Sequence, residues 1–250
     1  MQDVIVIKLG GVASDNLTET FFKQISAWQK EGKKIVVVHG GGHYISEMME
    51  RLKLSVQIKA GLRVTTEEAL TITKMVLLGQ VQPMITAYFQ QAGFSVVGLN
   101  ASSSQLITGE YIDQHTLGAV GEVVEIDTGL LDDLLSTAHL PVVAPLGLTK
   151  AGEWLNINAD HVACKIAEAM EAEALYLLTD VPGVKKADTW LKQLTPVEIT
   201  QLKAADVIKG GMLPKIESAQ TAIESGVKKV HITNQINKAG TIIRKEEVQV

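Results

Sequence analysis

The chain has 250 residues, and its 23 Lys and Arg residues against 28 Asp and Glu residues give a net charge of −5, a poor match to a nucleic acid partner. Hydrophobic residues make up 46% of the chain, too many for a disordered protein, and its one cysteine, Cys164, excludes an internal disulfide and a cysteine-ligated zinc site. No apolar run approaches the ~20 residues of a membrane span and no basic leader precedes the first run, so we expect a soluble protein of the cytoplasm.

Short apolar runs alternate along the chain with segments of helical spacing. The runs cover residues 4–7, 35–38, 95–99, 141–144, 174–178 and 230–233. Continuous apolar runs are typical of strands that are buried on both faces in a parallel sheet. Apolar residues recur at helical spacing within 21–28, 45–52, 162–170 and 216–223. The alternation predicts an α/β protein whose helices cover both faces of the sheet.

Residues 106–127 interrupt this alternation. Glycines punctuate short polar and apolar stretches there, which predicts an antiparallel β-hairpin inserted into the α/β frame. If the chain forms two lobes, the boundary falls after a helix near residue 172. Residues 1–172 and 173–250 would then form lobes that share one continuous sheet.

Two glycine clusters follow the first two predicted strands. Residues 8–11 (KLGG) follow the first strand, and residues 39–42 (HGGG) lie between the second strand and a helix. Glycine lets backbone N–H groups approach an anion, and the start of a helix adds positive potential. Either cluster alone could serve only as a tight turn, and the chain has neither a dinucleotide-binding G-x-G-x-x-G nor a P-loop. Two clusters at the carboxyl ends of consecutive strands favour an anion site.

Arg63 lies in the segment GLRVT at residues 61–65, ahead of a helical run that Thr65 or Thr66 would cap. Its guanidinium suits bidentate capture of a carboxylate. A lone arginine is more often a surface residue, so this assignment depends on its neighbours.

Polar and apolar residues alternate at residues 156–160 (NINAD), which places Asn156, Asn158 and Asp160 on one face of an extended segment. Asp160 is well placed as the N-cap of the helix that follows. Alternatively, its carboxylate could hold two lysines through charge-assisted hydrogen bonds. The two asparagines are harder to explain as caps.

Thr179 and Asp180 end the fifth apolar run, ahead of a Pro-Gly turn that closes at Gly183. This polar pair could meet a nucleotide or simply start the turn. We expect His161 on a helix surface and His231 in a strand, both structural. No histidine pattern has metal-ligand spacing, and no G-x-S-x-G indicates a hydrolase nucleophile.

A third glycine cluster, residues 209–215 (KGGMLPK), precedes the last predicted helix, which begins around Pro214 and ends at Gly226. Lys215 then lies in the first helical turn, where a cation opposes the helix dipole at a cost below ~1 kcal/mol. A bound anion would reverse that balance. A solvated surface lysine is the alternative.

These segments together resemble the amino acid kinase superfamily and, within it, the N-acetyl-L-glutamate kinase family. They are KLGG (8–11), VVVHGGG (36–42), GLRVT (61–65), VGEVVEIDTGLL (120–131), NINAD (156–160), LLTDVPGV (177–184) and GGMLPK (210–215). The resemblance covers nearly the whole chain. It implies an open three-layer αβα sandwich around a mainly parallel sheet. The N-terminal lobe would bind the acyl-amino acid and form a homodimer, and the C-terminal lobe would bind ATP.

The resemblance implies transfer of the γ-phosphoryl group of MgATP to the γ-carboxylate of N-acetyl-L-glutamate, a step in arginine biosynthesis. The implied catalytic residues are Lys8, Lys215, Asp160, Gly11 and Gly41. The implied contacts of the acyl-amino acid are Gly41, Gly42, Arg63 and Asn156. The implied contacts of the nucleotide are Lys8, Gly10, Gly11, Thr179, Asp180, Gly183, Lys209 and Lys215. Mg²⁺ would be held by phosphate oxygens and water, with no metal ligand from the protein.

The chain departs from the family's pattern in two places. Gln82-Pro83 stands where the family usually has Asn-Lys, and Pro83 is expected to kink or end a helix. Residues 100–105 (NASSSQ) replace a Gly/Asp-rich turn. Because the chain begins at its first strand, without the N-terminal helix by which arginine-inhibited relatives form hexamers, we also expect a homodimer that arginine does not inhibit.

Two other functions remain open from the sequence. One is a kinase of another carboxylate, such as an α-aminoadipate derivative in lysine synthesis. The other is a non-catalytic sensor of amino acids or nucleotides on the same fold. A degenerate sensor would be expected to lose Lys8, Asp160 or Lys215, and all three are present.

Overall fold

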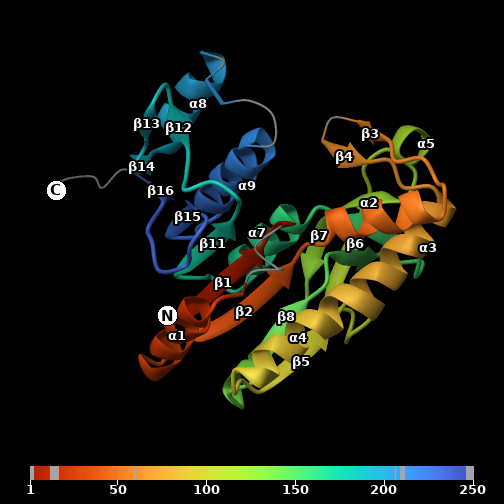
Figure 1. The fold of residues 1–250 in the computed structure, drawn as a ribbon, viewed down its shortest axis with the longest axis horizontal. Coiled ribbons are helices and arrows are strands. Elements are labelled where there is room, and N and C mark those ends of the chain that lie inside the picture. Colours follow the sequence, from red (N-terminus) through yellow and green to blue (C-terminus); the bar gives the residue numbers. More distant parts are fainter. Residues whose placement is uncertain (1–2, 12–16, 60, 206, 209–211, 246–250) are drawn as a thin grey trace.

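The computed structural model describes residues 3–11, 17–59, 61–205, 207–208 and 212–245, and eight strands of these residues form one sheet (Figure 1). In sheet order they are β14 (Gln193–Leu194), β16 (Thr241–Ile243), β15 (Lys229–Thr233), β11 (Ala174–Leu178), β1 (Val4–Leu9), β2 (Lys34–His39), β8 (Leu140–Val143) and β5 (Val96–Leu99). Every neighbouring pair is parallel except β15 and β16. The predicted mainly parallel sheet is confirmed.

Helices cover both faces of this sheet because its central strands are apolar on both sides. In β1, Val4 and Val6 belong to one buried cluster, whereas Ile5 and Ile7 belong to the other. The first cluster includes residues of α6 (Gly129–Ser136), α7 (Ala159–Ala169), α8 (Pro196–Ala204) and α9 (Met212–Glu224). The second includes residues of α1 (Glu19–Lys30), α2 (Gly42–Arg51), α3 (Glu67–Val76) and α4 (Gln82–Gln91). The fold is therefore a three-layer αβα sandwich.

A small closed barrel stands beside the sheet. It consists of β10 (Trp154–Ile157), β7 (Val120–Ile126), β6 (Ile107–Tyr111) and β9 (Leu146–Leu148), and α5 (Gln114–Leu117) connects β6 to β7. Strands β6 and β7 are antiparallel, which confirms the hairpin predicted near residues 106–127. The sequence did not reveal that β9 and β10 complete a barrel. Gly121 permits this closure, because a Cβ there would lie 2.7 Å from Leu155 Cδ1.

Two short hairpins project from opposite sides of the molecule, as Figure 1 shows. Hairpin β3 (Ile58–Lys59) and β4 (Leu62–Arg63) lies near α2, and hairpin β12 (Lys185–Lys186) and β13 (Thr189–Trp190) lies near α8. Strands from both sides belong to the one eight-stranded sheet. The division into lobes at residue 172 remains a prediction. Within the described ranges, no helix has both the length and the apolar character that a membrane span requires.

The helix around Gln82-Pro83 is interrupted by a π-helical turn, η2 (Leu77–Val81), and then continues as α4. The sequence predicted a kink or an end at Pro83; the helix does not end there, and Pro83 lies in the first turn of α4, where the helix changes from π to α. The Gln82 side chain enters the interior, where Nε2 donates to the carbonyls of Leu99 at 2.7 Å and Val142 at 3.0 Å. Gln82 thereby ties the helix to the carboxyl ends of β5 and β8.

The buried histidine at the end of β2 predicts a pH-dependent stability. His39 Nδ1 lies 2.8 Å from the Gly40 carbonyl, so Nδ1 carries the proton, and burial lowers the His39 pKa from 6.5 to about 4. Below pH 6.5 the unfolded chain therefore binds a proton that the folded chain rejects, and the free energy of unfolding should fall by about 2 kcal/mol by pH 5.

Urea unfolding at pH 7 and pH 5 tests this. In His39→Gln the fall in the free energy of unfolding between pH 7 and pH 5 should be smaller than in the wild type by about 2 kcal/mol. In His115→Gln, at an exposed position, the fall should equal that of the wild type. Equal pH dependence in the wild type and His39→Gln would contradict the assignment.

Candidate active site

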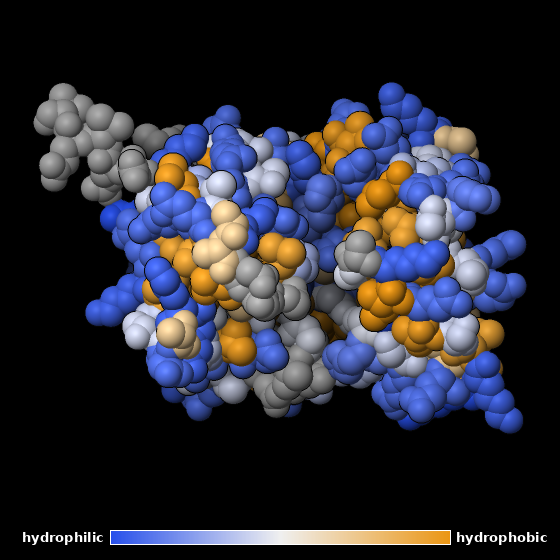
Figure 2. Space-filling view, turned by 90° about the horizontal axis from the view of Figure 1, so that it is seen from above, coloured by the Kyte–Doolittle hydropathy of each residue, from blue (hydrophilic) through white to orange (hydrophobic). Residues whose placement is uncertain are grey.

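Two cavities open at the carboxyl edge of the sheet, where the molecule is hollowed between two halves (Figure 2). The Arg63 cavity, about 340 Å³, is lined by Gly41, Gly42, Arg63 and Asn156 among others. The Thr179 cavity, about 240 Å³, is lined by Lys8, Gly10, Gly11, Leu178, Thr179, Asp180 and Lys215. Lys8 and Gly11 line both cavities. Two ligands, one in each cavity, would therefore both contact Lys8.

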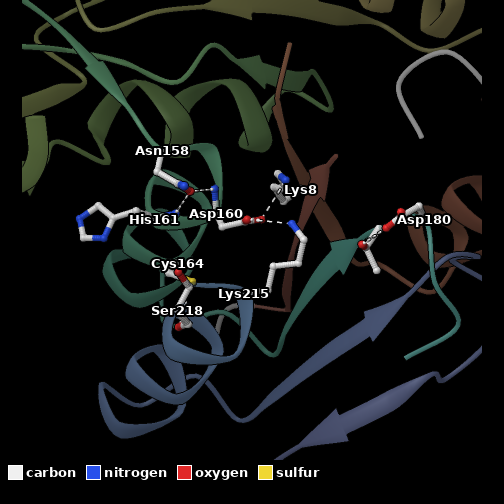
Figure 3. Close-up of polar contacts among 9 residues, drawn as sticks. Lys8, Asn158, Asp160, His161, Cys164, Asp180, Lys215 and Ser218 are labelled. Atoms are coloured by element: carbon white, nitrogen blue, oxygen red, sulfur yellow. Dashed lines mark hydrogen bonds and ion pairs between the residues drawn. The ribbon is translucent and has the colours of Figure 1, made fainter. Parts of the chain in front are cut away.

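Two lysines that are distant in the sequence meet at one carboxylate (Figure 3). Lys8 Nζ lies 2.9 Å from Asp160 Oδ1, and Lys215 Nζ lies 2.9 Å from Asp160 Oδ2. The side chains of Lys8, Asp160 and Lys215 are only 8%, 7% and 18% exposed. The structure thus brings together the three charged residues that the sequence analysis singled out.

Burial and charge act in opposite directions on Asp160. Burial alone would raise its pKa, but the ammonium groups of Lys8 and Lys215 hold the pKa at about 2. The pKa of Lys8 is lowered, first by burial and then by Lys215, against the attraction of Asp160. Two cations and one anion leave the cluster with a net positive charge. The cluster is therefore suited to an additional anion such as a phosphoryl group.

The sequence suggested Asp160 as the N-cap of α7, but Asp160 does not cap this helix. Asn158 is the cap, because its Oδ1 accepts from the backbone N–H groups of Asp160 and His161 at 2.8 and 3.3 Å. The alternating pattern was misleading because β10 ends at Ile157, and Asp160 already lies in the first helical turn. With the cap supplied by Asn158, the Asp160 carboxylate is available to both lysines.

His161 also differs from the expectation of a surface position. It is half-buried, and its Nε2 accepts from the backbone N–H of Val123 at 3.2 Å, so it links α7 to the barrel strand β7. His231 lies in β15 as expected, buried and stacked on Tyr176.

The glycine loops bring backbone close to the lysine cluster. A Cβ on Gly10 would lie 2.9 Å from Lys8 Nζ and 2.5 Å from the Leu178 carbonyl oxygen, so only glycine fits. Gly41 has a φ of +156°, and a Cβ there would lie 2.7 Å from Leu77 Cδ2. The π-helical turn that begins at Leu77 therefore supports the loop between β2 and α2. Residues of both loops line the Arg63 cavity together with Lys8.

Arg63 and Asn156 line the same cavity and are each held by a neighbour. Arg63 Nη2 donates to the Gly42 carbonyl at 2.9 Å and to Ser46 Oγ at 2.7 Å, and burial lowers the Arg63 pKa. Asn156 Nδ2 donates to Thr65 Oγ1 at 3.0 Å. No sequence pattern pointed to Ser46 as a partner of Arg63. The sequence allowed Thr65 as an alternative cap, but Thr66 caps α3.

Some of the residues expected at a nucleotide line the Thr179 cavity, and others do not. Thr179 Oγ1 donates to Asp180 Oδ1 at 2.9 Å, and both residues line the Thr179 cavity. Gly183 instead packs against Thr241, where a Cβ would lie 2.5 Å from Oγ1. Lys209 lies outside the described residues. Lys215 lies in the first part of α9, as predicted.

A larger cavity of about 480 Å³, which the sequence did not suggest, shares Thr179 and Asp180 and is bordered by residues 234–237. It extends the Thr179 cavity away from the lysines toward the start of α1. Across the part of the chain that the structure describes, no three His, Cys, Asp or Glu side chains gather as a metal site would require. Both oxygens of Asp160 already contact lysines.

An αβα sandwich with two lysines at one carboxylate, beside glycine loops at the sheet edge, is the arrangement of a phosphate-binding α/β protein. Residues 3–234 match the model of the amino acid kinase family, and the chain belongs to this family. It is 53% identical to an acetylglutamate kinase of Listeria welshimeri over 98% of both chains. It is 47% identical to an acetylglutamate kinase of Leuconostoc mesenteroides, over 96% of this chain and 98% of that one. The crystal structure of smu.665 from Streptococcus mutans superposes with a TM-score of 0.94 at 37% identity, covering 98% of this chain and 100% of that chain.

Removing the charge of Asp160 should strongly destabilise the fold. Asp160→Asn leaves two buried ammonium groups without their shared anion, which should lower the free energy of unfolding by about 3 kcal/mol or more. Glu173→Gln is the matched control, because Glu173 contacts Lys33 and Lys229 in a more exposed network. It should cost less than about 1 kcal/mol. Equal losses of unfolding free energy in the two variants, measured by urea unfolding at pH 7, would contradict the burial of the Lys8–Asp160–Lys215 cluster.

Proposed function

We propose that this protein transfers the γ-phosphoryl group of MgATP to the γ-carboxylate of N-acetyl-L-glutamate. The products are N-acetyl-L-glutamyl 5-phosphate and ADP, and the reaction is a step in arginine biosynthesis. The observation that carries the proposal is the Lys8–Asp160–Lys215 cluster at the junction of the two cavities. The high identity to acetylglutamate kinases over nearly the whole chain supports this choice of acceptor.

The chemistry requires charge stabilisation and alignment rather than a base. The acceptor carboxylate has an ordinary pKa of about 4.3, so it is ionised at neutral pH. One of its oxygens forms a bond to the γ-phosphorus while the bond from that phosphorus to the β–γ bridging oxygen breaks. ADP leaves with the bonding electron pair, and no proton is transferred. The enzyme has to hold the two oxygens in line and stabilise the charge on the transferring group.

The lysine cluster supplies that stabilisation. Lys8 lines both cavities, so its ammonium would lie beside the phosphoryl group on the donor side and on the acceptor side, and Lys215 lines the cavity on the nucleotide side. Asp160 holds both cations at fixed positions, which removes the cost of reorganising them during the reaction. Backbone N–H groups of Gly10, Gly11 and Gly41 would contact phosphate oxygens.

The Arg63 cavity would hold the acyl-amino acid. Arg63 Nη2 donates to Gly42 and Ser46, and Nη1 makes a weak contact with Met49 Sδ at 3.6 Å. A guanidinium has five N–H groups, and a carboxylate that displaces the weak sulfur contact would bind through Nη1. Gly41, Gly42 and Asn156 complete the contacts. On the other side, Thr179, Asp180, Lys209 and Lys215 would contact the nucleotide, whereas Gly183 packs against Thr241. Mg²⁺ bound to ATP would neutralise phosphate charge, and it would be held by phosphate oxygens and water.

The remaining features are also proposals. Residues 1–172 would form the acyl-amino acid lobe and residues 173–250 the nucleotide lobe. A homodimer is supported by the apolar side chains that α3 and α4 expose, Met75 and Tyr88, and by β5 as an outer strand of the sheet. The cytoplasm is the compartment that would supply ATP.

The choice of acceptor is tested by a coupled assay for ADP with MgATP and one acid at a time. N-acetyl-L-glutamate should give a kcat/KM at least about tenfold above those of L-glutamate and N-acetyl-α-aminoadipate, because one missing group or extra methylene costs about 1–3 kcal/mol. Turnover of the aminoadipate derivative with none of acetylglutamate would instead establish the lysine-synthesis alternative. Binding of either substrate without any turnover would indicate the sensor.

The role of Lys8 is tested by exchanging its compact charge for a broader one. Lys8→Arg should lower kcat by more than about tenfold with the fold intact, because a planar guanidinium cannot replace an ammonium between Asp160 and a phosphoryl group. Lys23→Arg, on the exposed face of α1, is the matched control and should keep the wild-type kcat. An unchanged kcat in Lys8→Arg would remove Lys8 from the mechanism.

A further inference from the structure

Thr65 lies next to the Arg63 cavity, where it contacts α5, the residue before β7, and Asn156 of β10. It has no exposed surface. Its backbone N–H donates to the Leu117 carbonyl at 2.8 Å, and its own carbonyl accepts from the N–H of Ala119 at 2.8 Å. The backbone is therefore fixed between α5 and β7, independently of the side chain. The hydroxyl is left to make contacts of its own.

That hydroxyl makes two hydrogen bonds, and its single proton decides their directions. Thr65 Oγ1 lies 2.8 Å from the Arg63 carbonyl oxygen and 3.0 Å from Asn156 Nδ2. A carbonyl can only accept, so the hydroxyl proton points to Arg63. Toward Asn156 the hydroxyl then offers only a lone pair. The Asn156 amide must answer with an N–H, which fixes Nδ2 toward Thr65.

The fixed orientation leaves the Asn156 carbonyl oxygen as the group for a ligand. Asn156 is half-buried and lines the Arg63 cavity, and its backbone is held by a hydrogen bond from its N–H to the Ala119 carbonyl at 2.8 Å. In the part of the chain that the structure describes, the Asn156 side chain hydrogen-bonds through Nδ2, and its Oδ1 accepts from no protein donor. An oxygen in that position selects a ligand that presents an N–H.

We propose that Thr65 is a positioning residue that fixes the Asn156 amide so that Oδ1 accepts the amide N–H of the acyl-amino acid. This inference rests on the proposed function and adds the basis of its selectivity. An acyl group linked through nitrogen presents the required donor. The same acyl group linked through an ester oxygen presents only lone pairs to Oδ1. Two hydrogen-bond acceptors that face each other leave both unpaired, which disfavours binding of the ester.

The experiment compares two acceptors that differ by this one group, N-acetyl-L-glutamate and its ester analogue 2-acetoxyglutarate, with MgATP. The wild type should prefer the amide by at least about tenfold in kcat/KM. Thr65→Val keeps the side-chain shape but removes the hydroxyl, so the Asn156 amide can turn and offer Nδ2 to the ester oxygen. The preference should then fall to a few-fold, with the KM for ATP unchanged.

Matched variants separate positioning from folding. Thr73→Val is the control, because Thr73 is also fully buried in this part of the fold and its Oγ1 has no hydrogen-bond partner among the described residues. It should keep the wild-type preference, as should Thr65→Ser, which retains the hydroxyl. If Thr65→Val does not fold, Thr65→Ala carries the same expectation.

Each outcome has a distinct meaning. A wild-type preference retained in folded Thr65→Val or Thr65→Ala overturns the inference and leaves the proposed function intact. Loss of preference in Thr73→Val equal to that in Thr65→Val also overturns it, because the effect would then be general to the core. A wild type that turns over neither acid overturns the proposed function itself.

Discussion

Asp160 contacts two ammonium groups that belong to opposite parts of the chain, and the rest of the site is arranged around this contact. Lys8 is near the carboxyl end of β1, and Lys215 lies in the first part of α9. Without the carboxylate, two partly buried cations at this separation would repel each other and lose their solvation. With it, they are held side by side while retaining a net positive charge. A single anion therefore both makes the buried lysines tolerable and leaves them attractive to phosphate.

The parallel sheet supplies the place for this contact. Parallel strands end at one edge, so the loops after β1, β2 and β11 gather there although they are far apart in the sequence. Gly10 allows Lys8 to fold back over the backbone, and Gly41 allows its loop to rest on the π-helical turn. Gln82 ties that turn to the ends of β5 and β8. The loops at the carboxyl edge of the sheet are thus held by contacts with the core rather than by surface contacts.

The sequence was a good guide to the elements and a poorer one to the exact role of each polar residue. The apolar runs predicted the strands because burial on both faces leaves an unbroken pattern. The alternation at residues 156–160 was misread because a change from strand to helix at Asn158 shifts the direction of the next side chain. Ser46 and Thr65 act on Arg63 and Asn156 across space, and their local patterns indicated only a helix and a cap.

By itself the amino-acid sequence determined the α/β class, the glycine loops at strand ends and the charged residues that make up the site, since these depend on local periodicity and residue chemistry. The tertiary structure alone decided that Lys8 and Lys215 share Asp160, that Asn158 rather than Asp160 caps α7, and that Thr65 orients Asn156. The Asn158 cap is a local contact that depends on where β10 ends and α7 begins. The lysine and Thr65 contacts depend on distances between segments more than fifty residues apart. Such distances are set by how the helices and the barrel pack on the sheet, and no local pattern encodes them.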